Sequence, residues 1–304
     1  MNNLVSVIIP CYNCANTIGR AIDSVLRQVY QPIEIILVNN NSTDETPEVL
    51  TSYQKLYPDK ITVLNQPKPG APAARNCGLY HAGGKWIQFL DADDELLPAK
   101  IEKQMQLAEA NQADIVAGEC LLKYTSENEA TTIVRTTDKD IWRGLITSNL
   151  GITSSNLWRR ATLLDINGWD EELTSSQEYD LLLRLLENKA KVVTDQLMNT
   201  VVHFSGNSVS KSTNVERKKE VLNNRISLRL RIKETLERQQ MLTVRLSRII
   251  DIYIYTEIIH YYNYFPDYAG ALIRKHKLNV SVVRKLRLKA KNFLKSIRFL
   301  LNLF

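Results

Sequence analysis

The chain has 304 residues, of which 44% are hydrophobic, and a formal net charge of +6. This length and composition allow a large buried core and predict one large domain with an appendage, or two domains. No run of eighteen apolar residues occurs, and residues 1–4 lack a basic region and a cleavage site, so we expect neither a membrane-spanning helix nor a signal peptide.

Charge and cysteine content add two further constraints. Residues 1–210 have a net charge of −8 and residues 211–304 one of +14, which indicates an acidic globule followed by a basic tail with a different role. The four cysteines do not suggest a disulfide framework at this length and favour a reducing cytosol. Cys11 and Cys14 have the CxxC spacing of a redox motif or half a zinc site, but no second CxxC accompanies them.

The first 111 residues alternate between short apolar runs and stretches of helical periodicity. The pattern predicts strands at residues 4–10, 33–38, 61–65 and 86–90. It predicts helices near residues 18–26 and at residues 46–57, 72–81 and 98–111. Apolar strands separated by helices indicate an α/β fold with a mainly parallel sheet covered on both faces.

Polar segments follow three of these strands, at the edge of the sheet where ligands of such folds bind. They are residues 10–13, residues 39–44 and an acidic run that contains Asp91, Asp93 and Asp94. Neighbouring carboxylates raise one another's pKa, so three acids at the tip of a buried strand favour a bound Mg²⁺ or Mn²⁺. The alternative is an acidic loop in which Asp94 and Glu95 stabilise the N-terminus of the next helix.

The sequence lacks the glycine-rich motifs of two common nucleotide-binding folds. Neither GxGxxG nor GxxxxGK[ST] occurs, which argues against a dinucleotide enzyme and a P-loop phosphotransferase. Phosphate charge would have to be met by a metal and by a side chain such as Arg75. The alternative for Arg75 is a surface-helix arginine.

The second half of the chain is less informative. A strand predicted at residues 113–124 leads into a polar loop at residues 125–138, and residues 152–158, 159–166 and 192–204 are predicted as strand, helix and strand. Long helices are expected at residues 215–240 and 249–265. The second is dense in isoleucine and tyrosine, which indicates either packing on the globule or on a second subunit, or an interfacial surface.

Six motifs, in order along the chain, resemble those of the inverting family-2 glycosyltransferases with the GT-A fold. They are residues 6–13 (SVIIPCYN), 41–44 (NSTD), 74–79 (ARNCGL), 89–94 (FLDADD), 168–171 (GWDE) and 178–184 (EYDLLLR). The resemblance implies a glycosyltransferase domain at residues 1–210, with a nucleotide-sugar-binding half at 1–111 and an acceptor half at 112–210. It does not reach the basic helical extension at residues 211–304.

The resemblance also implies roles for individual residues. Asp91 and Asp93 correspond to the DxD pair at the ribose and at the Mn²⁺ or Mg²⁺ on the diphosphate, with Asp93 holding the metal. Glu178 is the candidate base for the acceptor hydroxyl. His203 resembles a histidine that closes over the diphosphate, although a lone histidine is more often structural. The implied donor-binding residues are Pro10, Tyr12, Asn39, Asn41, Arg75, Asp91 and Asp93.

One departure from the family pattern concerns the nucleotide base. Asn39 and Asn40 stand where the family usually has one or two aspartates, and an amide oxygen accepts the imide N–H of uracil or thymine more weakly than a carboxylate does. We expect UDP- or dTDP-sugars to be favoured, with the base left open. The alternative for this run is a plain turn in which Ser42 and Glu45 form a capping box.

A second departure is the glutamate at the base position, where many relatives carry aspartate. The longer side chain extends the reach toward the acceptor. From the residues alone, Ser175 and Glu178 also fit a capping box, and Asp180 with Arg184 fits an i,i+4 ion pair.

Residues 280–304 have the pattern of a basic amphipathic helix. Apolar residues recur at three- and four-residue steps, namely Val283, Leu286, Ala290, Phe293, Ile297, Leu300, Leu301 and Phe304. Seven cations occupy most of the remaining wheel, too many for insertion, so we expect the helix to lie on an anionic membrane surface. The alternative is a helix that packs on the globule and turns its cations to solvent.

These features predict a metal-dependent glycosyltransferase, peripheral on the cytoplasmic face of the membrane, that extends a saccharide or lipid-linked acceptor in cell-surface polysaccharide synthesis. One alternative is a nucleotidyltransferase, but residues 10–13 are not its glycine-rich basic loop. Another is a non-catalytic binding module, against which Asp91, Asp93 and Glu178 argue. Nucleic acid is not an expected partner, because the most basic part of the tail lacks interspersed aromatic platforms.

Overall fold

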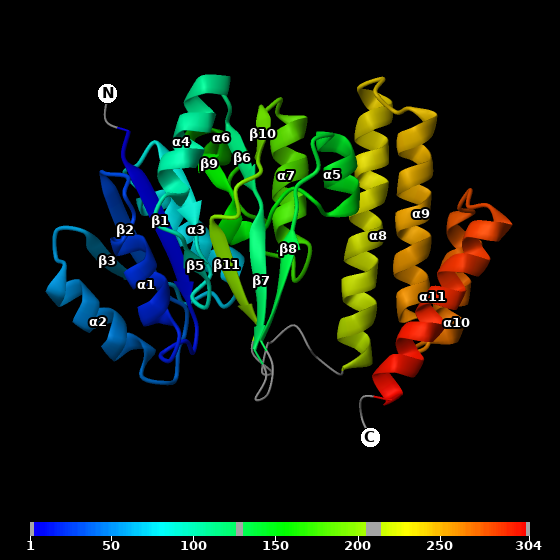
Figure 1. Cartoon of the computed structure of the whole chain (residues 1–304), viewed down its shortest axis with the longest axis horizontal. Helices are drawn as coiled ribbons and strands as arrows, with labels where there is room; N and C mark the ends of the chain where they lie inside the picture. The colour runs from blue at the N-terminus through cyan, green and yellow to red at the C-terminus, as the bar shows by residue number, and fades with distance from the viewer. Residues whose placement is uncertain (1–2, 126–129, 205–213, 302–304) are drawn as a thin grey trace. The chain divides into compact units, whose positions relative to one another are not determined.

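The structure is a computed structural model that describes residues 3–125, 130–204 and 214–301 (Figure 1). The chain divides into two compact units. The first comprises residues 1–173 and 177–208, and the second comprises residues 174–176 and 209–304. Among the described residues, both β-sheets belong to the first unit.

A seven-stranded sheet forms the centre of the first unit, in the order β10-β6-β9-β4-β1-β2-β3. Its strands are β1 Val5–Cys11, β2 Ile33–Asn39, β3 Ile61–Asn65, β4 Trp86–Phe89, β6 Ile115–Gly118, β9 Leu157–Arg159 and β10 Val192–Asp195. Neighbours are parallel except that β9 runs antiparallel to β4 and β6. The predicted mainly parallel sheet is confirmed, and β1 to β4 begin and end within one residue of the predicted bounds.

Helices pack on both faces of this sheet because its strands are apolar on both faces. Val7 and Ile9 of β1 share a core with Ile22, which belongs to the first helix. The third helix packs against the opposite face, where a Cβ added to Gly78 would overlap the side chain of Ile8, so glycine is needed for this close approach. The helices of this half are α1 Ile18–Leu26, α2 Thr46–Leu56, α3 Ala71–His81 and α4 Lys100–Asn111.

A second, four-stranded sheet has the order β5-β11-β7-β8. Its strands are β5 Glu95–Leu96, β7 Cys120–Thr125, β8 Ala130–Arg135 and β11 Thr200–Phe204. β11 is parallel to β7 and antiparallel to β5, and β7 pairs antiparallel with β8. The strands predicted at residues 113–124 and 192–204 therefore each divide between the two sheets.

The prediction of a loop at residues 125–138 is wrong for the part that the structure describes, because strand β8 lies within this range. Five of the six β8 residues are exposed, so the strand lacks the alternation of buried side chains that marks a strand in a sequence. Main-chain pairing holds it to β7, from Cys120↔Arg135 to Thr125↔Ala130. Residues 126–129 lie outside the described residues.

The prediction of a strand at residues 152–158 is wrong for the first half of this range. A 3₁₀ turn, η1 Thr153–Ser155, lies there and precedes β9. Oγ of Ser155 accepts a hydrogen bond from the amide of Ile152 at 2.9 Å, and such side-chain bonds compete with a strand ladder. The predicted helix that follows is confirmed. The helices of this part are α5 Ile141–Thr147, α6 Arg160–Asp165 and α7 Gln177–Glu187.

The described part of the second unit is helical, with α8 Val215–Arg238, α9 Val244–Tyr261, α10 Pro266–His276 and α11 Val282–Leu301. Buried residues of α8 and α9 pack together, and Arg225 forms an ion pair with Glu257 at 2.6 Å. The long helices expected here are confirmed, although α9 begins and ends earlier than predicted. α10 was not predicted.

Of the apolar face predicted within residues 280–304, the described side chains of Val283 and Leu286 do not pack on α9. Leu288 and Asn292 approach α9, where Nδ2 of Asn292 donates to the carbonyl of Ile259 at 2.9 Å. Val283 and Leu286 are 78% and 63% exposed. Of the predicted apolar residues, the side chains of Phe293, Ile297, Leu300, Leu301 and Phe304 lie outside the described residues.

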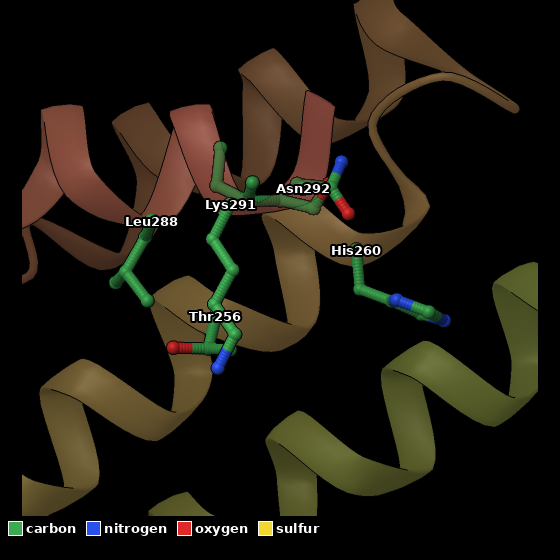
Figure 2. Close-up of a pocket in the computed structure, with 6 residues that line it drawn as sticks. Thr256, His260, Leu288, Lys291 and Asn292 are labelled. Atoms are coloured by element: carbon green, nitrogen blue, oxygen red, sulfur yellow. The ribbon is translucent and has the colours of Figure 1, made fainter. Parts of the chain in front are cut away.

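A small cavity of ≈ 110 Å³ lies between α9 and α11 (Figure 2). It is lined by Thr256, Ile259, His260, Leu288, Lys291 and Asn292. None of these is a predicted donor or catalytic residue. Within the described ranges, every helix is too short or too polar to cross a lipid bilayer.

Candidate active site

The polar ends of three strands meet at one edge of the main sheet. β1 and β2 are paired up to Cys11↔Asn39, and the amide of Asn40 donates to the carbonyl of Cys11 at 2.8 Å. On the other side of β1, the amide of Leu90 donates to the carbonyl of Ile8 at 3.0 Å. The structure therefore brings the segments 10–13, 39–44 and 91–94 together, as parallel strands require.

The asparagines at the end of β2 and just after it differ in whether their side-chain oxygens remain available to a ligand. Asn40 is buried, and its amide group bonds the main chain of Gln66, Lys68 and Gly70, so it shapes the loop. Oδ1 of Asn39 accepts from the amide of Ser42 at 3.2 Å, which leaves one lone pair for a ligand. Asn41 is exposed and has φ +63°, a left-handed conformation that asparagine tolerates.

The capping box suggested for Ser42 and Glu45 is wrong. α2 begins at Thr46, whose amide is bound instead by Oδ1 of Asp44 at 3.1 Å. Oγ of Ser42 accepts from the amide of Asn13 at 3.1 Å and so ties this loop to the one after β1. A hydrogen bond from Thr46 lowers the pKa of Asp44, which remains an ionised acceptor for these loop bonds.

The loop after β1 exposes Tyr12 and buries its two cysteines. The Tyr12 side chain is 60% exposed, and Pro10 before it is partly buried opposite Val38. Cys11 and Cys14 are free, buried thiols, and burial raises the pKa of Cys11. Reactive cysteines need accessible thiolates, and the described residues contain no cluster of three or more His, Cys, Asp or Glu suited to a metal. Neither interpretation of the CxxC spacing gains support.

The acidic run after β4 turns its carboxylates in different directions. Asp94 is buried, and burial followed by the charge of Asp91 raises its pKa well above the ordinary value. Asp93 is exposed. Its pKa is raised mainly by partial removal from water and to a smaller extent by the charge of Asp91. Nη2 of Arg20 donates to the carbonyl of Asp93 at 2.6 Å. Because Glu95 begins β5 and Asp94 points inward, the helix-stabilising alternative for these two acids is wrong.

Ser154 of η1 fixes this acidic loop. Its Oγ accepts from the amide of Asp91 at 3.1 Å and donates to Oδ2 of Asp94 at 2.5 Å. Its carbonyl accepts from Nε2 of Gln88 at 2.9 Å, and Lys100, which is fully buried, donates to Oε1 of Gln88. The sequence did not predict this network, and its only signal was the polar run at residues 153–156.

Arg75 lies in the interior, so the surface-helix alternative for it is wrong. It is 6% exposed, and its Nη2 forms an ion pair with Oδ1 of Asp91 at 2.7 Å. Nη1 donates to Oε1 of Gln177 at 3.3 Å, and the guanidinium lies over the ring of Trp169 at 4.7 Å. Arg75 therefore connects the aspartate loop to the first residue of α7.

Glu178 is half-buried in the first turn of α7. Burial raises its pKa, the charges of Arg135 and Arg75 lower it, and that of Asp91 raises it. Glu178 is thus within electrostatic reach of the ion pair at the aspartate loop. The capping box suggested with Ser175 is wrong, because Glu178 is the second residue of the helix and the preceding Ser176 has φ +59° rather than an extended N-cap conformation.

Two contacts hold the segment before α7 in place. The amide group of Asn76 donates to the carbonyl of Trp169 at 2.9 Å and accepts from its N–H at 2.8 Å. The predicted pair of Asp180 and Arg184 is present at 2.8 Å, and Arg184 also donates to the carbonyl of Gly168 at 2.7 Å. This ion pair is more than a surface contact, because Asp180 is buried.

The chemistry of Asp91 and Asp93 fits a hard divalent cation. Oδ1 of Asp91 is engaged by Arg75, and among the described residues its Oδ2 has no partner. Two carboxylates suffice for Mg²⁺ or Mn²⁺ when phosphate and water supply the other ligands. His203 lies on β11 with Nε2 3.4 Å from Oε2 of Glu95, and burial lowers its pKa. Residues 205–210 after it lie outside the described residues.

Sequence comparison finds related proteins over the same region. A sequence model described as Glycosyl transferase family 2 matches residues 6–165. The UDP-Glc:alpha-D-GlcNAc-diphosphoundecaprenol beta-1,3-glucosyltransferase WfaP of Escherichia coli is 30% identical over 211 residues, covering 68% of this chain and 80% of WfaP. An uncharacterized glycosyltransferase of Rickettsia prowazekii is 46% identical over 104 residues, covering 34% of this chain and 31% of that protein. This chain therefore spans less than a third of the length of that relative.

Solved structures show the fold. TarS of S. aureus, in complex with UDP-GlcNAc, superposes with a TM-score of 0.61 at 17% identity over 95% of this chain and 80% of the TarS chain. The mannosyltransferase PcManGT of Pyrobaculum calidifontis, in complex with GDP-Man and Mn²⁺, superposes with a TM-score of 0.57 at 17% identity over 97% of this chain and 86% of that chain. The expected GT-A fold is confirmed.

Proposed function

Since this chain belongs to glycosyl transferase family 2, we propose that it moves a sugar from a nucleotide diphosphate donor to a saccharide or lipid-linked acceptor, with inversion at the anomeric carbon. The observation that carries the proposal is the ion pair of Arg75 and Asp91 at the end of β4, with Glu178 in electrostatic reach of both. This arrangement supports a donor site at the end of β4 with the candidate base nearby. Cell-surface polysaccharide synthesis is the proposed setting.

The donor is held by the loops at the ends of β1, β2 and β4. Pro10, Tyr12, Asn39 and Asn41 surround the base and ribose, and the exposed ring of Tyr12 offers a face for stacking. Arg75, Asp91 and Asp93 lie where the diphosphate of the donor would bind. Support comes from TarS and PcManGT, which share the fold and are described with bound nucleotide sugars.

Departure of the nucleotide diphosphate requires neutralisation of its developing negative charge. Asp93, aided by Asp91, would hold Mn²⁺ or Mg²⁺, which when bound would supply Lewis-acid stabilisation of the leaving diphosphate. Arg75 fixes the position of Asp91 through its ion pair and adds positive charge. PcManGT, described with Mn²⁺, supports the choice of cation.

Glu178 accepts the proton of the acceptor hydroxyl during inversion. Direct displacement needs the base on the face of the sugar opposite the leaving diphosphate, and Glu178 comes from α7 in the second half of the domain. A carboxyl group with a pKa raised by burial is a stronger base than an exposed glutamate once ionised. The raised pKa of Glu178 therefore supports its role as the proton acceptor.

The metal requirement is tested with Asp93→Ala and chelation. We expect Asp93→Ala to lower sugar transfer by roughly 10² or more, because the cation loses its main protein ligand. Donor hydrolysis is measured across a panel of sugar nucleotides. EDTA should abolish hydrolysis by the wild-type protein, and Mn²⁺ or Mg²⁺ should restore it. Asp59→Ala, an exposed aspartate, serves as the matched control. Unchanged hydrolysis in EDTA would refute metal dependence.

The base assignment is tested with Glu178→Gln. The substitution keeps size and removes proton acceptance, so turnover should fall by roughly 10² or more while donor binding and folding persist. Turnover is measured with saturating donor, and folding by urea unfolding. Glu187→Gln at the far end of α7 is the control. Retained turnover with lowered stability would mean that Glu178 serves the helix and not the reaction.

The nucleotide preference is tested by titration calorimetry. We propose that UDP and dTDP bind more tightly than GDP, because Oδ1 of Asn39 can accept the imide N–H of uracil or thymine. Asn39→Asp should tighten UDP binding by roughly fivefold, since hydrogen bonds to a charged acceptor are stronger. The exposed Asn188→Asp should have no effect. Tighter binding of GDP by the wild type would overturn the preference.

We further propose that α11 attaches the protein to an anionic membrane at its cytoplasmic face. Val282, Val283, Leu286 and Leu294 are all more than 60% exposed, and Arg284, Arg287, Lys289 and Lys291 are exposed on the same helix. Apolar side chains enter the lipid boundary while each cation near an anionic surface adds about 1 kcal/mol before screening. Docking of this kind would place the enzyme beside lipid-linked acceptors.

Sedimentation with liposomes tests this attachment. The full chain should sediment with anionic liposomes at low salt, and Val283→Asp combined with Leu286→Asp should release it, because both side chains leave the apolar surface. Val244→Asp is the matched control, since Val244 of α9 is 77% exposed and Val283 is 78% exposed. Failure of the full chain to sediment, or equal release by the control, would contradict the membrane proposal.

A further inference from the structure

A turn of three residues directly precedes the helix that carries the candidate base Glu178. Residues 174–176 form this turn and belong to the second compact unit, whereas Leu173 before them and Gln177 after them belong to the first. The side chain of Gln177 closes the turn, because its Nε2 donates to the carbonyl of Leu173 at 2.8 Å. A displacement of the turn would therefore move Gln177 and, next to it in the chain, Glu178.

Three side chains of α8 bind this turn. Nη2 of Arg217 donates to the carbonyl of Thr174 at 2.8 Å, and Oγ1 of Thr174 donates to Oε1 of Glu220 at 2.6 Å. Nδ2 of Asn224 donates to Oγ of Ser175 at 3.0 Å and to Oγ1 of Thr174 at 3.4 Å. Residues 217, 220 and 224 are three and four positions apart, so they share one face of the helix. We call these three residues the α8 clamp.

The charged residues of the α8 clamp also support each other. Nη1 of Arg217 forms an ion pair with Oε2 of Glu220 at 2.8 Å. Hydrogen bonds from Thr174 and Arg217 lower the pKa of Glu220, so its carboxylate is ionised and accepts both. Oδ1 of Asn214 accepts from the amides of Glu216 and Arg217, which caps α8 just before this face begins. Local contacts therefore fix the part of the clamp that binds Thr174.

The turn needs such support because its last residue has an unfavourable backbone conformation. Ser176 has φ +59°, in the left-handed region, where a residue with a Cβ is less stable than glycine. Oε1 of Gln177, the next residue, accepts from Nη1 of the buried Arg75 at 3.3 Å. Contacts on both sides, from the α8 clamp to Ser175 and from Arg75 to Gln177, therefore hold this conformation.

We propose that the α8 clamp is a positioning element for sugar transfer, which fixes the turn at residues 174–176 and thereby the orientation of Glu178 toward the acceptor. This role rests on the proposed function of Glu178 as the base. A base acts only within hydrogen-bonding reach of the proton that it accepts, and small displacements lower the rate strongly. The helical extension thereby takes part in sugar transfer, in addition to the membrane attachment proposed for α11.

The position of the clamp allows its effects on the reaction and on stability to be separated. Thr174 and Glu220 are exposed, and the ion pair of Arg217 with Glu220 is in contact with water. Hydrogen bonds and ion pairs at such places add little to the free energy of unfolding, because water competes for the same groups. Variants of the clamp should therefore fold like the wild type.

Hydrogen–deuterium exchange tests the clamp without relying on catalysis. Thr174→Val removes the hydroxyl that binds Glu220 and Asn224 but keeps the shape of the side chain. In the full chain, the peptide spanning residues 173–183 should exchange roughly fivefold faster, the factor expected for loss of one hydrogen bond. Thr174→Ser, which keeps the hydroxyl, should stay close to the wild-type rate. Thr51→Val is the matched control, because Thr51 is also exposed and its Oγ1 forms a hydrogen bond within α2.

Turnover compared with donor binding provides the second readout. Thr174→Val should lower turnover of the sugar nucleotide that the wild type hydrolyses fastest by roughly tenfold, because the base is misplaced. The Kd of the corresponding nucleoside diphosphate, measured by calorimetry, should stay unchanged. Asn224→Ala should show both the faster exchange and the lower turnover. The neighbouring Asn223→Ala, which loses a hydrogen bond from Tyr268, should show neither. A merely structural role would lower the stability to urea and leave the turnover of the folded protein unchanged.

The two readouts separate this inference from the proposed function. Unchanged exchange in both Thr174→Val and Asn224→Ala would overturn the clamp. Faster exchange with unchanged turnover would overturn its positioning role and leave the assignment of Glu178 intact. Full turnover in Glu178→Gln would instead remove the base function, and with it the positioning role, even where exchange shows that the clamp holds the turn.

Discussion

The ion pair between Arg75 and Asp91 is the contact on which the geometry of the site depends. Arg75 is almost fully buried, and its charge is acceptable there only because Asp91 lies 2.7 Å away. Removing Asp91 would leave the Arg75 charge buried and unpaired, which is unfavourable. The same guanidinium contacts Trp169 and Gln177, so this one side chain holds α3, the end of β4 and the start of α7 in a common arrangement. The aspartate loop and the start of the helix that carries Glu178 are thereby held together.

A second constraint acts beneath the aspartates. Ser154 bonds both the amide of Asp91 and the carboxyl of Asp94, and its carbonyl is bound by Gln88, which in turn is bound by the buried Lys100. Buried polar groups that are all hydrogen-bonded restrict a loop to one conformation. Asp94 is drawn inward by this network and leaves Asp91 and Asp93 at the surface. The acidic run thus divides into one structural acid and two acids that remain accessible at the end of β4.

The helices of the second unit differ in how much of their apolar surface they bury. α8 and α9 bury their isoleucines and leucines against each other, as amphipathic helices in water do. α11 instead contacts α9 with Leu288 and Asn292 and leaves valines and leucines exposed between its cations. An exposed apolar stripe on a basic helix is unfavourable in water and favourable at a lipid boundary. This is consistent with the membrane attachment proposed for α11.

The sequence by itself determined the parallel strands β1 to β4, the helices between them and the convergence of their polar ends, because apolar periodicity reports burial directly. It also determined the family, through six ordered motifs, and the pairing of Asp180 with Arg184. The tertiary structure alone decided which polar residues are structural. Asn40 and Asp94 look like site residues in the sequence but are buried in loop bonds, whereas Arg75, for which the sequence left a surface position as the alternative, lies inside. β8 left no periodic pattern because its side chains are exposed, and Ser154 acts through partners far away in the chain. Contacts of that kind arise from three-dimensional packing and leave no signal in local sequence.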